Sequence, residues 1–265
     1  MSNYVDLYHN TYSNFKEEVL SEVRRETDGE DIGQNSWITA DEYDRFYAWL
    51  NLSANAHVLE IASGSGRPAI YLARRFGCRI TGVDINQDGI ASARQAAQDA
   101  GVAGVDFQWA DADQRLPFDE NTFDAVLCAD SMNHFRDRLE YFKEWHRVLK
   151  PGRRMFFTDP VVITGPVTNE ELAARSNIGF FLFVPLEVTK RFLTEAGFTL
   201  IHCEDVTVNI EQTSGRWYDA REKRRAALIE IEGQERFEGL QRFLSTVHTL
   251  TSERRLSRYL FVAEK

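Results

Sequence analysis

Short apolar runs alternate with helical patterns through the middle of the chain. Five runs have the length and apolar content of buried strands: residues 58–61, 79–83, 105–109, 123–128 and 154–158. Three segments between or after these runs carry apolar side chains at helical spacing: residues 68–76, 86–100 and 138–149. Strands that alternate with helices predict a parallel sheet that is covered by helices on both faces.

The N-terminal part of the chain has no strand pattern. Within residues 3–20, aromatic side chains such as Tyr8 and Tyr12 recur every three or four positions, which predicts one apolar face of a helix. A polar loop and a second helix over residues 39–50 follow. The aromatic face fits either a helix that docks on the core or a lid over a ligand, and we assign residues 1–50 to an N-terminal helical lid.

The last part of the chain returns to strands around a helical stretch. Residues 198–208 and 256–263 are typical of strands, and the charged segment between them is largely helical. A strand that returns without a crossover helix fits an antiparallel edge on a parallel sheet. The sequence thus predicts an α/β fold with a doubly wound, seven-stranded, mostly parallel sheet, an antiparallel C-terminal strand and a helical cap. The core spans residues 51–210 and 254–265, and the cap spans residues 211–253.

Composition argues against several classes of protein. The net charge is −10 and the isoelectric point is about 5.2, which does not suit a surface for nucleic acid or anionic lipid. No apolar run approaches the ~18 residues of a membrane span and no signal pattern begins the chain, so we expect a cytoplasmic protein. Cys78, Cys128 and Cys203 have spacings that suit neither a metal site nor a disulfide framework, so no metal is expected.

A glycine-containing turn joins the first predicted strand to its helix. The turn spans residues 63–66 with glycine at Gly64 and Gly66, and Pro68 opens the helix. Glycines let the backbone approach a ligand, and the helix N-terminus faces that ligand with unpaired N–H groups. The turn fits a dinucleotide fingerprint, with the acid Asp84 about 20 residues further on. By itself the turn leaves the choice of cofactor open.

Polar groups end four consecutive predicted strands. In a doubly wound sheet the ligand lies at the carboxyl ends of the strands, where the strand order reverses. The polar stretches at these ends are residues 60–66, 84–86, 111–113 and 130–134. One such stretch arises readily by chance, whereas four in order predict a shared binding site.

These stretches resemble the class I S-adenosylmethionine-dependent methyltransferases. The matching pieces are residues 58–66, 82–85, 110–112, 116–118, 123–126, 146–152, 196–198 and 258–263. Within the class, the sequence is similar to the small-molecule branch that includes phosphoethanolamine and sarcosine/dimethylglycine methyltransferases. Glu60 stands where the family more often has Asp. The resemblance implies a Rossmann-like fold and S-adenosyl-L-methionine as the cofactor.

The resemblance assigns the strand ends to parts of the cofactor. It implies that Asp84 accepts hydrogen bonds from both ribose hydroxyls, that Asp111 accepts from the adenine amino group, and that the Ala112 N–H meets a ring nitrogen. Gly64 and Gly66 are expected under the methionine part. The full set of implied cofactor-binding residues is Ser36, Glu60, Ala62, Ser63, Gly64, Gly66, Asp84, Ile85, Asp111, Ala112 and Ala129.

The stretch after the fourth strand is implied to face the reacting methyl group. By resemblance, His134 is the catalytic base or an orienting group, and Asp130 contacts the methionine amino group or an acceptor amine. A lid tyrosine, Tyr12 or Tyr8, is implied to assist. Neutral imidazole suits proton removal near pH 7. A histidine that only caps its loop by hydrogen bonding is the alternative.

An aromatic run at Phe180, Phe181 and Phe183 lies where phosphobase enzymes of this branch hold a phosphate. Phenyl rings do not bind a phosphate and are costly to leave in water. We expect these rings, together with Trp217 in the cap and Tyr8, either to pack as core or to line an apolar acceptor pocket.

The sequence therefore predicts a methyltransferase that modifies N or O of a small, mainly apolar metabolite. We expect a monomer or homodimer, without a nucleic-acid or membrane partner. One alternative is a non-catalytic protein of the same fold that binds S-adenosylmethionine or a nucleotide. Another is an NAD-dependent oxidoreductase, which would leave Asp111 and the closing strand pair unexplained.

Overall fold

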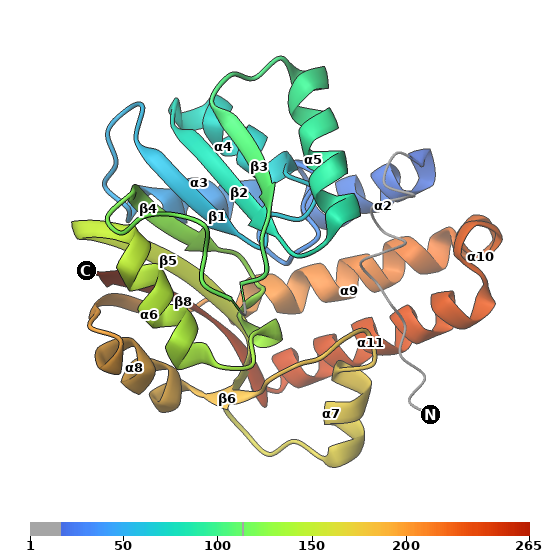
Figure 1. Cartoon of the computed structure of the whole chain (residues 1–265). Coiled ribbons are helices and arrows are strands. Elements are labelled where there is room, and N and C mark those ends of the chain that lie inside the picture. The colour runs from blue at the N-terminus through green and yellow to red at the C-terminus, as the bar shows by residue number, and fades with distance from the viewer. Residues whose placement is uncertain (1–16, 113) are drawn as a thin grey trace.

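An eight-stranded sheet forms the centre of the molecule (Figure 1). The computed structural model describes residues 17–112 and 114–265. The strand order is β3-β2-β1-β4-β5-β8-β7, and the short β6 pairs with β5. The strands are β1 (His57–Ile61), β2 (Arg79–Asp84), β3 (Val105–Trp109), β4 (Phe123–Cys128), β5 (Leu149–Ile163), β6 (Val184–Pro185), β7 (Thr199–Asp205) and β8 (Leu256–Glu264).

Strand directions confirm the predicted fold class. β1 pairs in parallel with β2 and with β4, and β8 runs antiparallel between β5 and β7. The short β6 adds an eighth strand to the seven predicted. The strand predicted over residues 198–208 ends earlier, at Asp205. Oδ1 of Asp205 accepts from the Thr207 N–H at 2.9 Å, which turns the chain into the next helix.

Helices cover both faces of the sheet, as the alternating pattern indicated. One face carries α3 (Ala40–Ala48), α4 (Arg67–Phe76) and α5 (Gln87–Ala100). The other face carries α6 (Arg138–Val148) and α8 (Leu186–Glu195). Burial of apolar side chains on both faces stabilises the folded state by roughly 25 cal/mol per Å² of apolar surface removed from water. The two packed layers hold the carboxyl ends of the strands in place.

Local sequence explains where the helices after β1 and β2 begin. Gly66, with φ of 68°, precedes α4, Pro68 lies in its first turn, and Gly77 ends it, also with φ of 68°. Asn86 Oδ1 accepts from the Gly89 N–H at 2.9 Å and caps α5. Short turns therefore connect the central strands to their helices.

The remaining helices form a lobe beside the sheet (Figure 1). They are α2 (Glu18–Asp28), α7 (Asn169–Arg175), α9 (Thr207–Lys223), α10 (Arg225–Glu232) and α11 (Gln234–Ser252). α9 packs against both α2 and α11. An ion pair between Arg224 and Glu26, at 2.8 Å, ties the cap to α2. Within the described ranges, none of the helices combines the length and the apolar content that a bilayer crossing requires.

Candidate functional site

A cavity of about 510 Å³ lies at the carboxyl ends of β1 to β4. The strand order reverses at β1, because β2 lies on one side of it and β4 on the other. Most of the predicted site residues line the cavity: Ser36, Glu60, Ala62, Ser63, Gly64, Asp84, Ile85, Asp111, Ala112, Ala129, Asp130, His134 and Phe180. The four polar strand ends thus converge on one place.

Gly66 lies behind the cavity wall rather than in its lining. A Cβ added at Gly66 would lie 2.5 Å from Ala93 Cβ and 2.5 Å from Phe107 Cζ. Its backbone is also left-handed, with φ of 68°. The close packing of α4, α5 and β3 therefore accounts for a glycine at this position.

The predicted acceptor-pocket aromatics separate into different environments. Phe181 and Phe183 stack with ring centroids 6.2 Å apart, outside the lining of the main cavity. Trp217 lines a second cavity under the cap. Tyr8 and Tyr12 lie outside the described residues. Phe180 is the member of the run that borders the main cavity.

Asp84, at the end of β2, accepts two backbone hydrogen bonds. The Gly64 N–H donates to Oδ2 and the Asn86 N–H donates to Oδ1, both at 2.8 Å. Burial raises the pKa of the Asp84 carboxyl, and the backbone N–H groups oppose that rise. The bond to Gly64 joins the glycine turn to β2. Each oxygen retains acceptor capacity for a ligand.

Glu60 lines the cavity from β1 and is 3% exposed. Burial raises the pKa of the Glu60 carboxyl to about 8, and the Asp84 charge adds to the rise. Among the described residues, neither Glu60 Oε2 nor Ser63 Oγ has a hydrogen-bond partner. Because buried polar atoms are normally paired, these two atoms mark a place for a polar ligand group.

Two residues with side chains adopt left-handed backbone at the ends of the central strands. The angle φ is 57° at Ala62, after β1, and 53° at Asp130, after β4. Such conformations cost on the order of 1–3 kcal/mol and persist where the surrounding structure holds them. Both residues line the cavity. The strain is therefore concentrated where the strand ends meet the site.

The Asp130 carboxylate is surrounded by donors from the protein itself. Oδ1 accepts from Thr158 Oγ1 and from Arg258 Nε, both at 2.7 Å. Oδ2 accepts from the Trp37 N–H at 2.9 Å and from Arg258 Nη2 at 3.2 Å. Arg258 is fully buried and also pairs with Glu42 at 2.8 Å. Contact of Asp130 with the methionine amino group or with an acceptor amine stays a prediction. In the structure, its hydrogen bonds hold the loop after β4 in place.

Arg258 and Glu42 are absent from the predicted site, although the sequence carries a signal for one of them. Arg258 is a cation that directly precedes the apolar and aromatic run 259–263 of a strand. A buried cation requires an anionic partner, so a charge at this position indicates a buried ion pair. The identity of that partner depends on tertiary contacts that a strand pattern does not contain.

Two tyrosines also line the cavity without having been predicted. Tyr43 comes from α3 and is 1% exposed, and Tyr141 comes from α6 and is 4% exposed. Among the described residues, Tyr141 Oη has no hydrogen-bond partner. Both tyrosines occur on apolar helix faces, where spacing does not separate a core position from a cavity position.

His134 ends a short 3-10 helix, η1 (Met132–His134). Its Nδ1 lies 2.9 Å from the Phe180 carbonyl oxygen, and its Nε2 lies 3.2 Å from Asn133 Nδ2. A carbonyl oxygen only accepts, so Nδ1 carries the proton and Nε2 the lone pair. Burial lowers the pKa of His134 to about 4, and the charge of Arg175 acts in the same direction. The imidazole is therefore neutral at pH 7.

The charge of the cavity favours a cationic ligand. The carboxylates of Asp84 and Asp111 line it, beside the Glu60 carboxyl that is protonated near neutral pH, and Arg136 is the one arginine among the described lining residues. A pyrophosphate would meet these carboxylates at close range, which is unfavourable. Within the described part of the chain, no three His, Cys, Asp or Glu side chains are grouped so that they could hold a metal ion.

Strand order and cavity together define a class of protein. Parallel strands in the order β3-β2-β1-β4-β5 are closed by the antiparallel β8 and β7. A glycine turn follows β1, the carboxylate of Asp84 ends β2, and that of Asp111 follows β3. This arrangement is that of the class I methyltransferases, which use S-adenosylmethionine.

Comparisons with known proteins identify the family. A model of the methyltransferase domain matches residues 59–157. The 27-O-demethylrifamycin SV methyltransferase of Amycolatopsis mediterranei is 32% identical over 71% of this chain and 71% of its own. The glycine/sarcosine/dimethylglycine N-methyltransferase of Actinopolyspora halophila is 28% identical over 79% of this chain and 37% of its own. The chain belongs to the S-adenosylmethionine-dependent methyltransferases, which sets aside the oxidoreductase alternative.

A solved structure agrees on the fold. The phosphoethanolamine N-methyltransferase 2 of Haemonchus contortus, in complex with phosphomonomethylethanolamine and S-adenosylhomocysteine, has a TM-score of 0.82 at 20% identity. The match covers 98% of this chain and 60% of that chain. At this level of identity, the likeness concerns the fold alone.

The residues of the main cavity fit S-adenosylmethionine. The Asp84 oxygens would accept from ribose hydroxyls, and the partnerless Glu60 Oε2 would accept from the ammonium group of the methionine part. When bound, the cofactor supplies an electrophilic methyl group on a sulfonium. The protein's own residues would then have to hold the acceptor atom in line with that methyl group and exclude water.

Proposed function

We propose that the protein methylates a hydroxyl oxygen of a small, mainly apolar metabolite. The neutral ring of His134 supports this proposal, because Nε2 carries its lone pair beside the main cavity, where a substrate hydroxyl would take the place of the Asn133 amide that donates to it at 3.2 Å. A hydroxyl keeps a lone pair for the methyl group while it donates its proton toward Nε2. An alkylammonium has no lone pair until it loses a proton, and an imidazole with a pKa of about 4 removes that proton poorly. The neutral ring thus favours oxygen over nitrogen.

The wall beside His134 supports an apolar acceptor. Phe135, Tyr141 and Phe180 line this part of the cavity, and the Phe135 and Tyr141 rings lie with centroids 4.4 Å apart. The Arg136 guanidinium stacks over the Phe180 ring, 4.6 Å from its centroid. The name of the Amycolatopsis mediterranei relative specifies an O-methylation, which agrees with this choice.

A paired panel tests the choice of atom. The full chain is incubated with methyl-tritiated S-adenosylmethionine and with 2-naphthol, 2-naphthylamine, ethanolamine or sarcosine, and mass spectrometry locates the added methyl group. We expect label on the oxygen of 2-naphthol and none on the two aliphatic amines. Label on the amines with none on the naphthol would contradict O-methylation, while the methyltransferase assignment would stand.

A further inference from the structure

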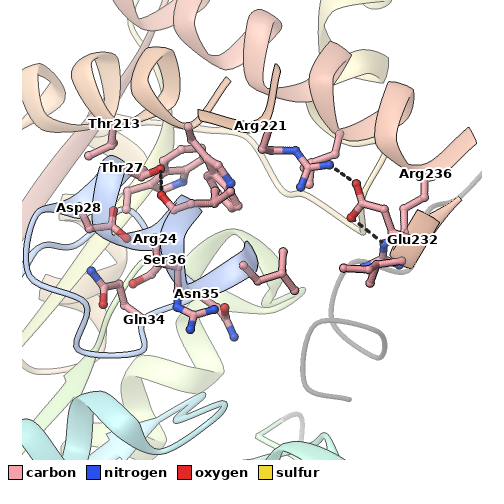
Figure 2. A pocket seen from close by; sticks show the side chains of 16 residues that line it. Arg24, Thr27, Asp28, Gln34, Asn35, Ser36, Thr213, Arg221, Glu232 and Arg236 are labelled. Carbon is pink, nitrogen blue, oxygen red and sulfur yellow. Dashed lines mark hydrogen bonds and ion pairs between the residues drawn. The ribbon is translucent and has the colours of Figure 1, made fainter. Parts of the chain in front are cut away.

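A second cavity, of about 80 Å³, lies between α2 and the cap helices (Figure 2). Asn35 and Ser36 line both this cavity and the main one, so the two cavities meet at these residues. The volume is several times the ~10–15 Å³ that one buried water requires. The space therefore suits one ring-sized group rather than a whole cofactor.

Two side-chain amides at this cavity lack partners. Within the described residues, Gln34 Nε2 and Asn35 Nδ2 are buried and make no hydrogen bond. Gln34 Oε1 accepts a hydrogen bond from the Ile32 N–H at 3.1 Å. This bond assigns the orientation of the side-chain amide, so Nε2 is the atom without a partner. Buried N–H groups of this kind call for an acceptor oxygen on a ligand.

Asp28 supplies a third polar group to the same cavity. Figure 2 shows Asp28, Gln34 and Ser36 on the side formed by α2 and the loop after it. Burial raises the pKa of the Asp28 carboxyl to about 7, with the Asp31 charge adding to the rise. The charges of Arg216 and Arg24 oppose that rise in pKa. Near neutral pH it exchanges between a hydrogen-bond donor and an acceptor.

Much of the remaining lining is apolar, and its arginines are paired with carboxylates. Trp37 and Trp217 meet edge to face with centroids 5.7 Å apart, and Leu240 is buried beside them. Arg221 and Arg236 both pair with Glu232 on the cap side of the cavity, and Arg24 pairs with Asp31 on the other side. Aromatic walls favour a flat ring, and the arginines of the lining are already held by carboxylates of the protein.

We propose that this second cavity binds one ring of the methyl acceptor, an uncharged ring that carries a hydroxyl or carbonyl oxygen. The Gln34 and Asn35 amides donate to that oxygen, and the Asp28 carboxyl accepts from a hydroxyl. The acceptor then extends past Ser36 to His134 in the main cavity. This inference rests on the proposed function and narrows its substrate to compounds with at least one oxygenated ring beyond the methylated group.

Fluorine NMR with two matched probes tests the proposal. The full chain, loaded with S-adenosylhomocysteine, is titrated with 4-fluorophenol and with 4-fluorotoluene, which differ only in hydroxyl against methyl. We expect 4-fluorophenol to bind at least about tenfold more tightly, because its hydroxyl makes hydrogen bonds that a methyl group cannot make. Gln34→Met should reduce this preference by weakening 4-fluorophenol alone, while the Asn35 amide and Asp28 remain. Gln98→Met, at an exposed position on α5, is the matched control and should behave as wild type.

A second variant keeps the test decisive if Gln34→Met fails to fold. Ile231 lines the second cavity and is only partly buried, so Ile231→Trp fills the space from its edge. It should weaken both probes at least about tenfold and leave S-adenosylhomocysteine affinity unchanged. The proposal is overturned if wild type binds neither probe, if Ile231→Trp binds both as wild type does, or if Gln34→Met retains the full preference of wild type. Failure of the proposed function looks different, since probes would bind as expected while no hydroxyl compound is methylated.

Discussion

The Glu60 carboxyl shows how burial changes one residue at the site. Its pKa of about 8 means that the folded protein without cofactor holds a proton at neutral pH. The unfolded chain releases that proton near pH 4.5. Between these two values the folded state binds the extra proton, so rising pH lowers its stability relative to the unfolded state.

Substitution of Glu60 by Gln isolates this effect. Gln imitates the protonated carboxyl, so the free energy of unfolding of Glu60→Gln should rise relative to wild type as pH goes from about 5 to about 8. The limiting slope is about 1.4 kcal/mol per pH unit. Urea unfolding at several pH values, without cofactor, measures the difference. A difference that does not change with pH would show that Glu60 is ionised in the folded protein.

The proposed catalytic contribution of His134 also depends on a single atom, Nε2. With a hydroxyl acceptor from the panel, His134→Ala should lower kcat about 100-fold, because the proton of the hydroxyl loses its partner. Affinity for S-adenosylhomocysteine should not change. His248→Ala, at an exposed position on α11, is the control. An unchanged kcat would restrict His134 to the role of a loop cap.

One buried arginine links four elements around the site. Arg258, on β8, binds Asp130 after β4 and Glu42 on α3. The same two carboxylates bind the loop and α9, through the Trp37 N–H and through Asn209 Nδ2. The network fixes the backbone of the loop that carries His134, so its integrity matters for the positions of several elements at once.

Removal of the arginine should destabilise the fold strongly. Arg258→Met leaves two buried carboxylates without their cation, which costs about 3–5 kcal/mol. The triple variant Arg258→Met, Glu42→Gln, Asp130→Asn should recover most of that loss, because no uncompensated charge is left. Denaturant unfolding measures the stability of both variants. Arg225→Met, which removes the exposed ion pair with Glu222, is the control and should have little effect. Equal loss in the single and triple variants would show that packing rather than charge is responsible.

Across the whole molecule, the sheet and its two helical layers could be predicted because their signals are local. Apolar runs of strand length and helical spacing each fall within a few residues of sequence. The strand-end motifs are equally local, so Asp84, Asp111 and His134 could be found before the topology brings them to one cavity. The doubly wound rule then places strand ends together without any knowledge of side-chain packing.

The rest of the site depends on contacts between distant parts of the chain. Arg258 and Asp130 lie 128 positions apart. The strand pattern around either residue does not predict that the two side chains form an ion pair. Gln34 and Asn35 occur in a polar stretch that is typical of an ordinary loop, and only tertiary packing buries their amides. The tyrosines Tyr43 and Tyr141 share their helical spacing with true core residues.

The central claim is that the strand ends form a single binding site for S-adenosylmethionine, with Asp84 as the ribose acceptor. Isothermal titration of S-adenosylhomocysteine into the wild type and into Asp84→Ala tests it most directly. Loss of a charged acceptor for two hydroxyls should weaken binding at least about 100-fold, at roughly 1.5–3 kcal/mol for each hydrogen bond to a charged group. Saturable binding to the wild type with that loss in the variant is the predicted result. Absence of binding to the wild type, or equal affinity in both proteins, would contradict the claim.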